Sequence, residues 1–271
     1  MHNKILNKNF KLTKFIKPYP FAIFNNFFEK NFYQELEKSI PLSSEFLKSD
    51  KKVGRFDADI SYESKLYKKI SETNHSFKKI HNYIYSNEFL NFFLKLFKEE
   101  IDDEYKKGNL ILDINKIEKV DFPVEGSTSV NIYNIKKNKK KILYPRFDVG
   151  VGLKNYGKLT GGGGIHIDNP QRIISIILFL GGYKSISGGE HRIWEKKNNE
   201  LDLFKSIKPE QNLLIASLQT NSAFHDVNPV KNIIGQRNTA YAAVSCNSYV
   251  WKSIKRNTFN KKYNKNRYKK N

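Results

Sequence analysis

The pattern of apolar residues along the chain changes its period near residue 110. Before that point apolar side chains recur every three or four residues, as they do on one face of an amphipathic helix. Phe32, Leu36 and Ile40 show this spacing. The elements predicted in this part are a short strand and turn at 19–30, a helix at 31–40, an irregular polar segment at 41–62 and two or three helices over 63–101.

After residue 110 apolar and polar residues alternate with a period of two, which is typical of half-buried strands. The clearest example consists of Phe147, Val149, Val151 and Leu153. The other predicted elements are a strand around Val130 and Ile132, a hairpin loop at 136–141, and strands at 165–168, 173–180, 190–194, 212–218, 222–228 and 237–246. No helical pattern of ten residues separates them, so the sequence favours an antiparallel sandwich or barrel over a doubly wound parallel sheet.

The two halves together predict an α+β fold in which N-terminal helices pack on a β core. We expect residues 1–104 to form a strand and helical support region of the same domain as a core at 105–250. Residues 251–271 are expected to form a basic, disordered tail. A chain of 271 residues is long enough to bury a core of useful size.

Composition narrows the class of protein. Apolar residues make up 39% of the chain and aromatic residues 14%, which excludes a disordered chain. Cys246 is the single cysteine, so a disulfide framework and a cysteine-based zinc site are excluded. The longest apolar run, 173–180, is broken by Ser175 and is far shorter than the roughly 20 residues of a membrane span. With no apolar signal segment at the N-terminus either, we expect a cytoplasmic protein that does not bind a membrane.

The net charge of +21 is concentrated in three segments. Residues 1–18, 136–146 and 252–271 contain 20 Lys and Arg residues and no acid, which leaves 28 basic and 27 acidic residues elsewhere. Basic tails can bind nucleic acid or another polyanion. The excess of Asn, Ile, Phe and Tyr also fits an AT-rich coding sequence, in which case the lysines serve only solubility. Nucleic acid is therefore a partner that the sequence allows but does not favour.

Three residues have the side chains and spacing of a metal site. His166 and Asp168 lie two residues apart on a predicted strand, so both side chains point to the same face. His225 follows 59 residues later on a separate predicted strand. Two neutral imidazoles and one carboxylate form the facial triad of non-haem Fe(II) oxygenases, which leaves three coordination positions open.

Two neighbouring motifs suggest other chemistry. The glycine run 161–164 suggests a phosphate-binding loop, but it leads into a strand and lacks the Gly-Lys-Ser/Thr sequence, so an entrance loop is the better interpretation. His191 is a rival ligand, which we assign a substrate-side or solvent role because His166 and Asp168 already account for the site.

The region 145–248 resembles the Fe(II)/2-oxoglutarate-dependent dioxygenase superfamily, and its prolyl-4-hydroxylase-like branch in particular. The resemblance rests on the triad and on three further motifs: Asn155-Tyr156-Gly157 leading to His166-Ile167-Asp168-Asn169-Pro170, Ser187-Gly188-Gly189 with Arg192-Ile193, and Arg237. It implies a double-stranded β-helix (jelly-roll) core, with Fe(II) held by His166, Asp168 and His225. It also implies 2-oxoglutarate as cosubstrate, O2 as co-reactant and ascorbate as a reductant.

The resemblance also implies which residues hold 2-oxoglutarate. Arg237 matches the basic residue that pairs with the distal carboxylate, and arginine suits this role because its guanidinium binds a carboxylate in two places. Tyr156 matches a tyrosine that bonds to the cosubstrate. Thr239 shares the strand face of Arg237 and adds a hydroxyl donor. One departure is Phe179, which stands where some members have another cosubstrate tyrosine.

The predicted function is hydroxylation of an unactivated C–H bond in a protein or peptide side chain or in a small molecule, with release of succinate and carbon dioxide. Arg172 is expected near the mouth of the site, where it binds an anionic or carbonyl group of the substrate or pairs with a surface acid. One alternative is a nucleic-acid demethylase, a branch that usually has a further Arg where this chain has Ala243. The other is a jelly-roll binding module without turnover.

Overall fold

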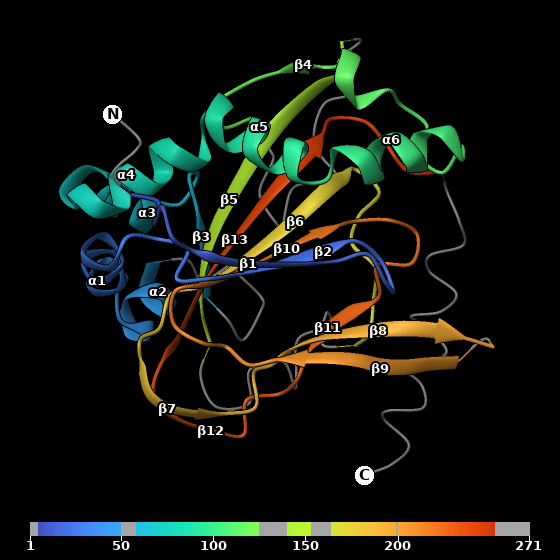
Figure 1. The fold of residues 1–271 in the computed structure, drawn as a ribbon. Helices are drawn as coiled ribbons and strands as arrows, with labels where there is room; N and C mark the ends of the chain where they lie inside the picture. The colour runs from blue at the N-terminus through green and yellow to red at the C-terminus, as the bar shows by residue number, and fades with distance from the viewer. Residues whose placement is uncertain (1–4, 50–57, 125–139, 153–163, 199, 253–271) are drawn as a thin grey trace.

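A computed structural model describes residues 5–49, 58–124, 140–152, 164–198 and 200–252 of the chain (Figure 1). The helices are α1 (Lys30–Ser39), α2 (Ser43–Ser49), α3 (Lys65–Thr73), α4 (His75–Ile84), α5 (Asn87–Leu96), α6 (Lys98–Lys106) and the short 3-10 helix η2 (Ile114–Lys116). The strands are β1 (Lys11–Phe15), β2 (Phe21–Asn25), β3 (Ala58–Ser61), β4 (Glu118–Lys119), β5 (Ile142–Gly152), β6 (Arg172–Phe179), β7 (Tyr183–Ser187), β8 (His191–Lys197), β9 (Glu200–Ile207), β10 (Leu213–Leu218), β11 (His225–Val227), β12 (Asn232–Gly235) and β13 (Arg237–Cys246).

Capping residues divide the predicted helical region 63–101 into separate helices. Ser64, Asn74 and Ser86 precede α3, α4 and α5, and each side chain accepts a hydrogen bond from the backbone N–H three residues later. Such a bond satisfies one of the free N–H groups at the start of a helix, so each cap fixes where a new helix begins. These three helices confirm the prediction, and α6 adds a fourth that starts at Lys98 inside the predicted region.

Most of the described strands form one large sheet of eight strands, in the order β1-β2-β10-β6-β13-β5-β3, with β4 beside β5. Two smaller sheets have the orders β11-β8-β9 and β12-β7. From β6 onward the chain leaves the large sheet for the smaller ones and returns twice, through β7–β9 to β10 and through β11 and β12 to β13, which is the topology of a double-stranded β-helix. The α+β fold with a double-stranded β-helix core is therefore confirmed.

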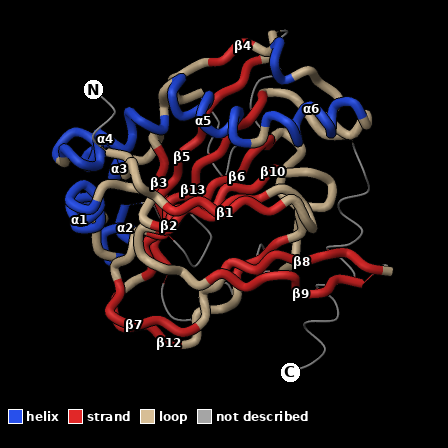
Figure 2. Tube along the Cα trace, in the orientation of Figure 1, coloured by secondary structure: helices blue, strands red, loops and turns tan. Residues whose placement is uncertain are grey.

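The two faces of the large sheet bury different sets of side chains. Ile174, Ile176 and Leu178 of β6 belong to the main core that also contains the helices, whereas Ile177 and Phe179 belong to a second core. Figure 2 shows the helices on one side of the large sheet and the β8–β9 pair on the other. Alternate residues of each strand thus face the helices or the space between the sheets, and the chemistry-bearing residues of β6 and β13 lie on the second face.

The strands confirm the predicted period, with corrections where the strands are exposed. β13 has the predicted bounds 237–246, and β6, β8, β10 and β11 lie within or close to their predicted ranges. β1, β4, β7, β9 and β12 were not predicted, because most of their side chains are exposed or half-buried and give no apolar signal. The prediction of an irregular segment at 41–62 was wrong, since it contains α2 and β3. The predicted strand at Val130 and most of the hairpin loop lie outside the described residues.

The predicted strand at 165–168 is reduced to a single bridge at His166. At the other end of the chain Trp251 is buried, and its Nε1 donates a hydrogen bond to the Arg172 carbonyl oxygen at 2.6 Å. Residues 253–271, which contain most of the predicted tail, lie outside the described part. Within that part, no helix is both long enough and apolar enough to cross a bilayer.

Candidate metal centre

A backbone bridge brings His166 and His225 together. The N–H of each residue donates to the carbonyl oxygen of the other at 3.0 Å, and the two imidazole rings have centroids 4.5 Å apart. His225 is the first residue of β11, and this reciprocal pair joins it to the segment just before β6. Two residues far apart in the sequence thus present their side chains on the same side of a short antiparallel pair.

Hydrogen bonds fix which nitrogen of each imidazole carries the proton. His166 Nδ1 lies 2.8 Å from the Gly164 carbonyl oxygen, and His225 Nδ1 lies 2.9 Å from the Ala223 carbonyl oxygen. Because a carbonyl oxygen can only accept, both Nδ1 atoms must donate, and the lone pair of each neutral ring is on Nε2. Burial, followed by the charge of His225, lowers the pKa of His166 to about 4, so this ring is neutral at pH 7.

Asp168 completes the group, and its carboxylate faces the Nε2 atoms of both rings. Its Oδ1 is 3.9 Å from His166 Nε2, and its Oδ2 is 3.9 Å from His225 Nε2. Burial acts to raise the pKa of Asp168, but the charge of the Arg172 guanidinium holds it well below its usual range. The side chain is therefore an ionised ligand at neutral pH.

Two polar groups hold the Asp168 carboxylate from the large sheet. Ser175 Oγ donates to Asp168 Oδ2 at 2.5 Å, and Arg172 Nη1 lies 2.8 Å from the same oxygen. Ser175 is the polar residue that interrupts the apolar run of β6, and this contact explains the interruption. Arg172, which we expected at the mouth of the site, pairs with the buried acid of the triad itself.

The three side chains fit a divalent transition-metal ion. Their donor atoms all lie within 4.8 Å of one another. Two ligands with bonds of about 2.1 Å to one ion are at most about 4.2 Å apart, and both His–Asp distances satisfy this limit. Two Nε2 lone pairs and one carboxylate oxygen suit Fe(II) in its facial-triad geometry and leave positions for other ligands.

Arg237 is buried in the second core, at the start of β13. Its side chain is 1% exposed, its Nη1 donates to Thr239 Oγ1 at 2.7 Å, and its Nη2 donates to the Gly189 carbonyl oxygen at 3.4 Å. The guanidinium carbon also lies 5.0 Å from the centre of the Phe179 ring. Thr239 and Phe179 are direct partners in the β13–β6 register, so the three side chains form one group. Tyr156 lies outside the described residues.

His191 lies between the triad and Arg237. It is 3% exposed, and its ring centroid is 5.5 Å from that of His225. Burial, followed by the charges of His225 and Arg237, lowers its pKa well below the usual range, so the ring is neutral. The group of possible metal ligands in the described chain does not include His191, which agrees with the assignment of a role other than ligand.

Sequence reasoning missed the residues that hold His225 in place. Asp226 is fully buried and accepts hydrogen bonds from Arg192 Nε at 2.8 Å and Trp194 Nε1 at 2.9 Å, besides a second bond from the Arg192 guanidinium. These bonds join β11 to β8 on the side opposite to the His225 ring. The position of an acid beside a candidate ligand was the only signal in the sequence.

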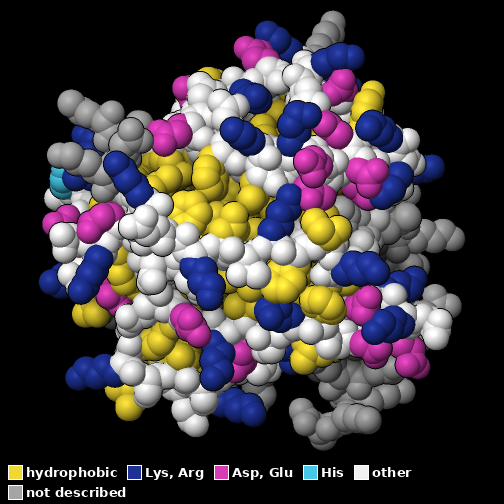
Figure 3. All heavy atoms as spheres, viewed as in Figure 1, with side chains coloured by type: hydrophobic (Ala, Val, Ile, Leu, Met, Phe, Trp, Pro, Cys, Tyr) yellow, Lys and Arg dark blue, Asp and Glu magenta, His cyan; other side chains and the backbone are white. Residues whose placement is uncertain are grey.

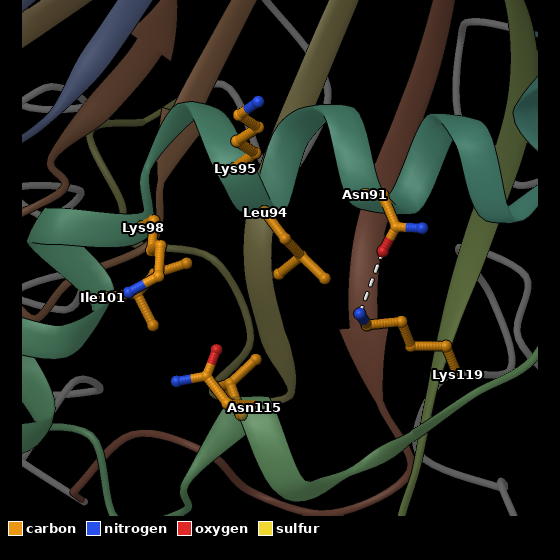
Figure 4. A pocket seen from close by; sticks show the side chains of 8 residues that line it. Asn91, Leu94, Lys95, Lys98, Ile101, Asn115 and Lys119 are labelled. Carbon is orange, nitrogen blue, oxygen red and sulfur yellow. Dashed lines mark hydrogen bonds between the residues drawn. The ribbon is translucent and has the colours of Figure 1, made fainter.

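A separate cavity lies on the helical side of the molecule (Figure 4). It has a volume of about 300 Å3, and its lining includes Lys95, Lys98 and Lys119. Lys98 pairs with Asp102 at 2.6 Å and Lys119 donates to Asn91 at 2.9 Å, so two of the three ammonium groups already have protein partners.

The face shown in Figure 3 has Lys and Arg interspersed with Asp and Glu. The basic segments 136–139 and 253–271 lie outside the described residues.

Comparison with known proteins gives matches of structure only. No protein-family model matches the chain, and neither does any curated protein sequence. Similar solved structures include a prolyl 4-hydroxylase from Phytophthora capsici, with 12% identity and a TM-score of 0.43 over 83% of this chain and 58% of that one. The chain thus spans little more than half of that protein.

Two further similar structures match more of their own length. A prolyl hydroxylase from Trichoplax adhaerens, in complex with a peptide fragment of hypoxia inducible factor, has 13% identity and a TM-score of 0.42 over 83% of both chains. A viral collagen prolyl hydroxylase from Paramecium bursaria Chlorella virus-1, in complex with 2-oxoglutarate, has 13% identity and a TM-score of 0.38 over 83% of this chain and 94% of that one. At these sequence identities and TM-scores, the assignment of an activity rests on the geometry of the site itself.

Proposed function

We propose that the chain is an Fe(II)- and 2-oxoglutarate-dependent dioxygenase that hydroxylates an unactivated C–H bond of a protein or peptide side chain or of a small molecule. The observation that carries this proposal is the group of three donor atoms: two imidazole Nε2 lone pairs, fixed by backbone carbonyls, and one ionised carboxylate. Fixed tautomers and a held carboxylate are what a metal centre requires of its ligands.

His166, Asp168 and His225 would hold the metal ion. When bound, Fe(II) and 2-oxoglutarate supply the oxidative chemistry, in which the cosubstrate is decarboxylated to succinate and one oxygen atom is transferred to the substrate. The apolar second core around Phe179 and Ile193 excludes water from the space beside the metal ligands. The protein thus contributes orientation and a dry site.

Arg237 would bind the distal carboxylate of 2-oxoglutarate. Its guanidinium is held by Thr239 and Phe179, so it is oriented before the cosubstrate arrives. Thr239 would add a hydroxyl contact to that of the Arg237 guanidinium, and we assign a further hydroxyl contact to Tyr156. We assign the substrate-facing role to Arg172, whose partner Asp168 places it at the metal centre.

The test measures metal binding and turnover separately. Purified protein is given Fe(II), 2-oxoglutarate, ascorbate and pools of peptides or metabolites, and succinate release and a mass gain of one oxygen are measured. His166→Ala should abolish both Fe(II) binding and succinate release, whereas His75→Ala, which changes an exposed histidine, should leave both intact. If the protein binds metal but releases no succinate with any pool, the alternative of a binding module without turnover is supported instead. Turnover by His166→Ala would refute the ligand assignment.

A second variant tests the cosubstrate site. Arg237→Lys keeps the positive charge but loses the two-point contact, so the 2-oxoglutarate concentration needed for half-maximal turnover should rise about tenfold or more. Fe(II) binding should be unchanged. An unchanged cosubstrate requirement would show that another residue binds the distal carboxylate.

A further inference from the structure

A cluster of polar side chains on the inner face of the large sheet is not explained by the proposed metal and cosubstrate sites, apart from the pairing of Arg172 with Asp168. Ser245 of β13 lies between Tyr144 of β5 and Arg172 of β6 in the strand register. Arg146 follows two residues after Tyr144, on the same face of β5. Because Arg172 pairs with Asp168, this cluster borders the candidate metal centre.

Four hydrogen-bond donors in this cluster are buried without a partner among the described residues. They are Tyr144 Oη, Ser245 Oγ, Arg146 Nε and Arg172 Nε. Buried donors in folded proteins are nearly always paired, so four in adjacent register positions are unusual. Burial raises the pKa of Tyr144, so its phenol keeps its proton and can donate. The cluster therefore offers donors to a group that has only acceptors.

The charges around these donors favour an anion. Arg146 pairs with Asp148, and Arg172 pairs with Asp168, so the two guanidinium groups are balanced by two carboxylates in the protein alone. A divalent ion bound at the triad would neutralise the negative charge of Asp168, and the cluster would then have excess positive charge. A group with one negative charge and several acceptor lone pairs would restore the balance.

We propose that Tyr144, Ser245, Arg146 and Arg172 form the subsite that binds a carboxylate group of the substrate. This inference rests on the proposed function and narrows its substrate to molecules that carry a carboxylate. The segment above the cluster is apolar, since Val120 and Val124 pack against the Tyr144 ring, and Tyr62 Oη holds the Val124 carbonyl oxygen at 2.6 Å. The proposed subsite thus lies beside an apolar segment and next to the metal ligand Asp168.

The probe that we choose is acetate, because it carries the predicted group and little else. Protein loaded with Mn(II) and saturated with 2-oxoglutarate is titrated with 13C-labelled acetate, and the paramagnetic relaxation of the carboxylate carbon gives both the affinity and the proximity to the metal. We expect strong relaxation in the wild type. Tyr144→Phe and Ser245→Ala should each weaken acetate binding about tenfold, since each removes one donor to a charged group.

Stability separates this role from a structural one. Because the two hydroxyl groups have no hydrogen-bond partner among the described residues, their removal should leave the melting temperature unchanged or slightly higher. Tyr249→Phe, which removes an exposed phenol, is the matched control and should change neither acetate binding nor stability. Weaker acetate binding together with unchanged stability supports the subsite.

Three outcomes overturn the proposal. Acetate that shows no relaxation fails to bind near the metal, and relaxation that neither variant changes places acetate on the metal itself. A loss of stability in both variants would mean that the hydroxyl groups have structural partners. If Mn(II) does not bind the wild type, the proposed function fails. The subsite can then still be tested by calorimetric titration of acetate into the metal-free wild type and the two variants.

Discussion

Asp226→Asn should strongly destabilise the protein, because Asp226 holds β11 against β8 from a fully buried position. The aspartate accepts hydrogen bonds from both the Arg192 guanidinium and the Trp194 indole. Asparagine keeps the size and one oxygen, but it removes the charge that balances Arg192 and turns an N–H group toward a donor. The mutation thus leaves a half-buried guanidinium without its counter-ion.

The expected loss follows from these contacts. Removal of one partner of a buried ion pair costs about 3–5 kcal/mol, and asparagine retains one acceptor, so we expect about 3 kcal/mol. The free energy of unfolding of a typical domain is about 5–15 kcal/mol, so a loss of about 3 kcal/mol is a large fraction of it. It corresponds to a fall of roughly 6–12 °C in melting temperature. Urea unfolding followed by circular dichroism and tryptophan fluorescence measures it, and Trp194 reports the local change directly.

The control for this prediction is Asp202→Asn on the neighbouring strand β9. Asp202 is exposed, so its replacement should change the free energy of unfolding by less than about 0.5 kcal/mol. Asp226→Asn should also weaken Mn(II) binding, because His225 is the preceding residue of the same three-residue strand. A loss of stability below about 1 kcal/mol in Asp226→Asn would refute the reasoning.

Three further predictions follow from the site and its supports. Ser175→Ala removes the hydroxyl that orients Asp168, so Mn(II) affinity measured by electron paramagnetic resonance should fall about 10–100-fold, and an unchanged affinity would show that Arg172 alone orients the carboxylate. Burial lowers the pKa of His166 to about 4, against about 6.5 in the unfolded chain, so the unfolded chain binds more protons than the folded one between these pH values. The free energy of unfolding measured in urea should therefore fall as the pH is lowered from 6.5 towards 4. Stability that does not change over this pH range would contradict the burial of a neutral ring. Gly188→Ala should lower the free energy of unfolding by at least about 2 kcal/mol, because Gly188 has a φ of +79° and a Cβ there would lie 2.1 Å from the Pro229 carbonyl oxygen. The control is Gly108→Ala, with a φ of +70° and no neighbour within 4 Å, which should lose only about 1 kcal/mol through backbone strain. Equal losses in the two variants would show that the clash at Gly188 is relieved.

The sequence predicted the triad because its geometry is local or follows from strand pairing. The i, i+2 spacing of His166 and Asp168 puts their side chains together in any extended segment, and His225 required only that two strands meet. Ser175 was visible as a polar break in an apolar run, although its partner was not. Asp226 gave no signal of its own, because a buried acid and an exposed acid are the same letter in a sequence.

The polar inner face could not be predicted for a similar reason. Alternation with a period of two shows that one face of a strand is polar, and a polar face normally contacts water. Tyr144, Arg146 and Ser245 are instead buried. Arg146 was therefore counted with the basic segment before the strand, whereas it lies in β5 and pairs with Asp148. Only tertiary packing, such as that of Val120 and Val124 against Tyr144, distinguishes the two cases.

The bridge between His166 and His225 has a consequence for the kinetics of the metal centre. In the described part of the chain the two backbones are joined by their reciprocal hydrogen bonds, and 58 residues of the chain lie between them. An ion bound to both imidazoles would close that loop a second time, as a covalent cross-link does, and would reduce the entropy gained when the bridge opens. Release of the ion and opening of the bridge would then be one event, so amide hydrogen exchange at these two positions should slow with added metal and report the residence time of the ion.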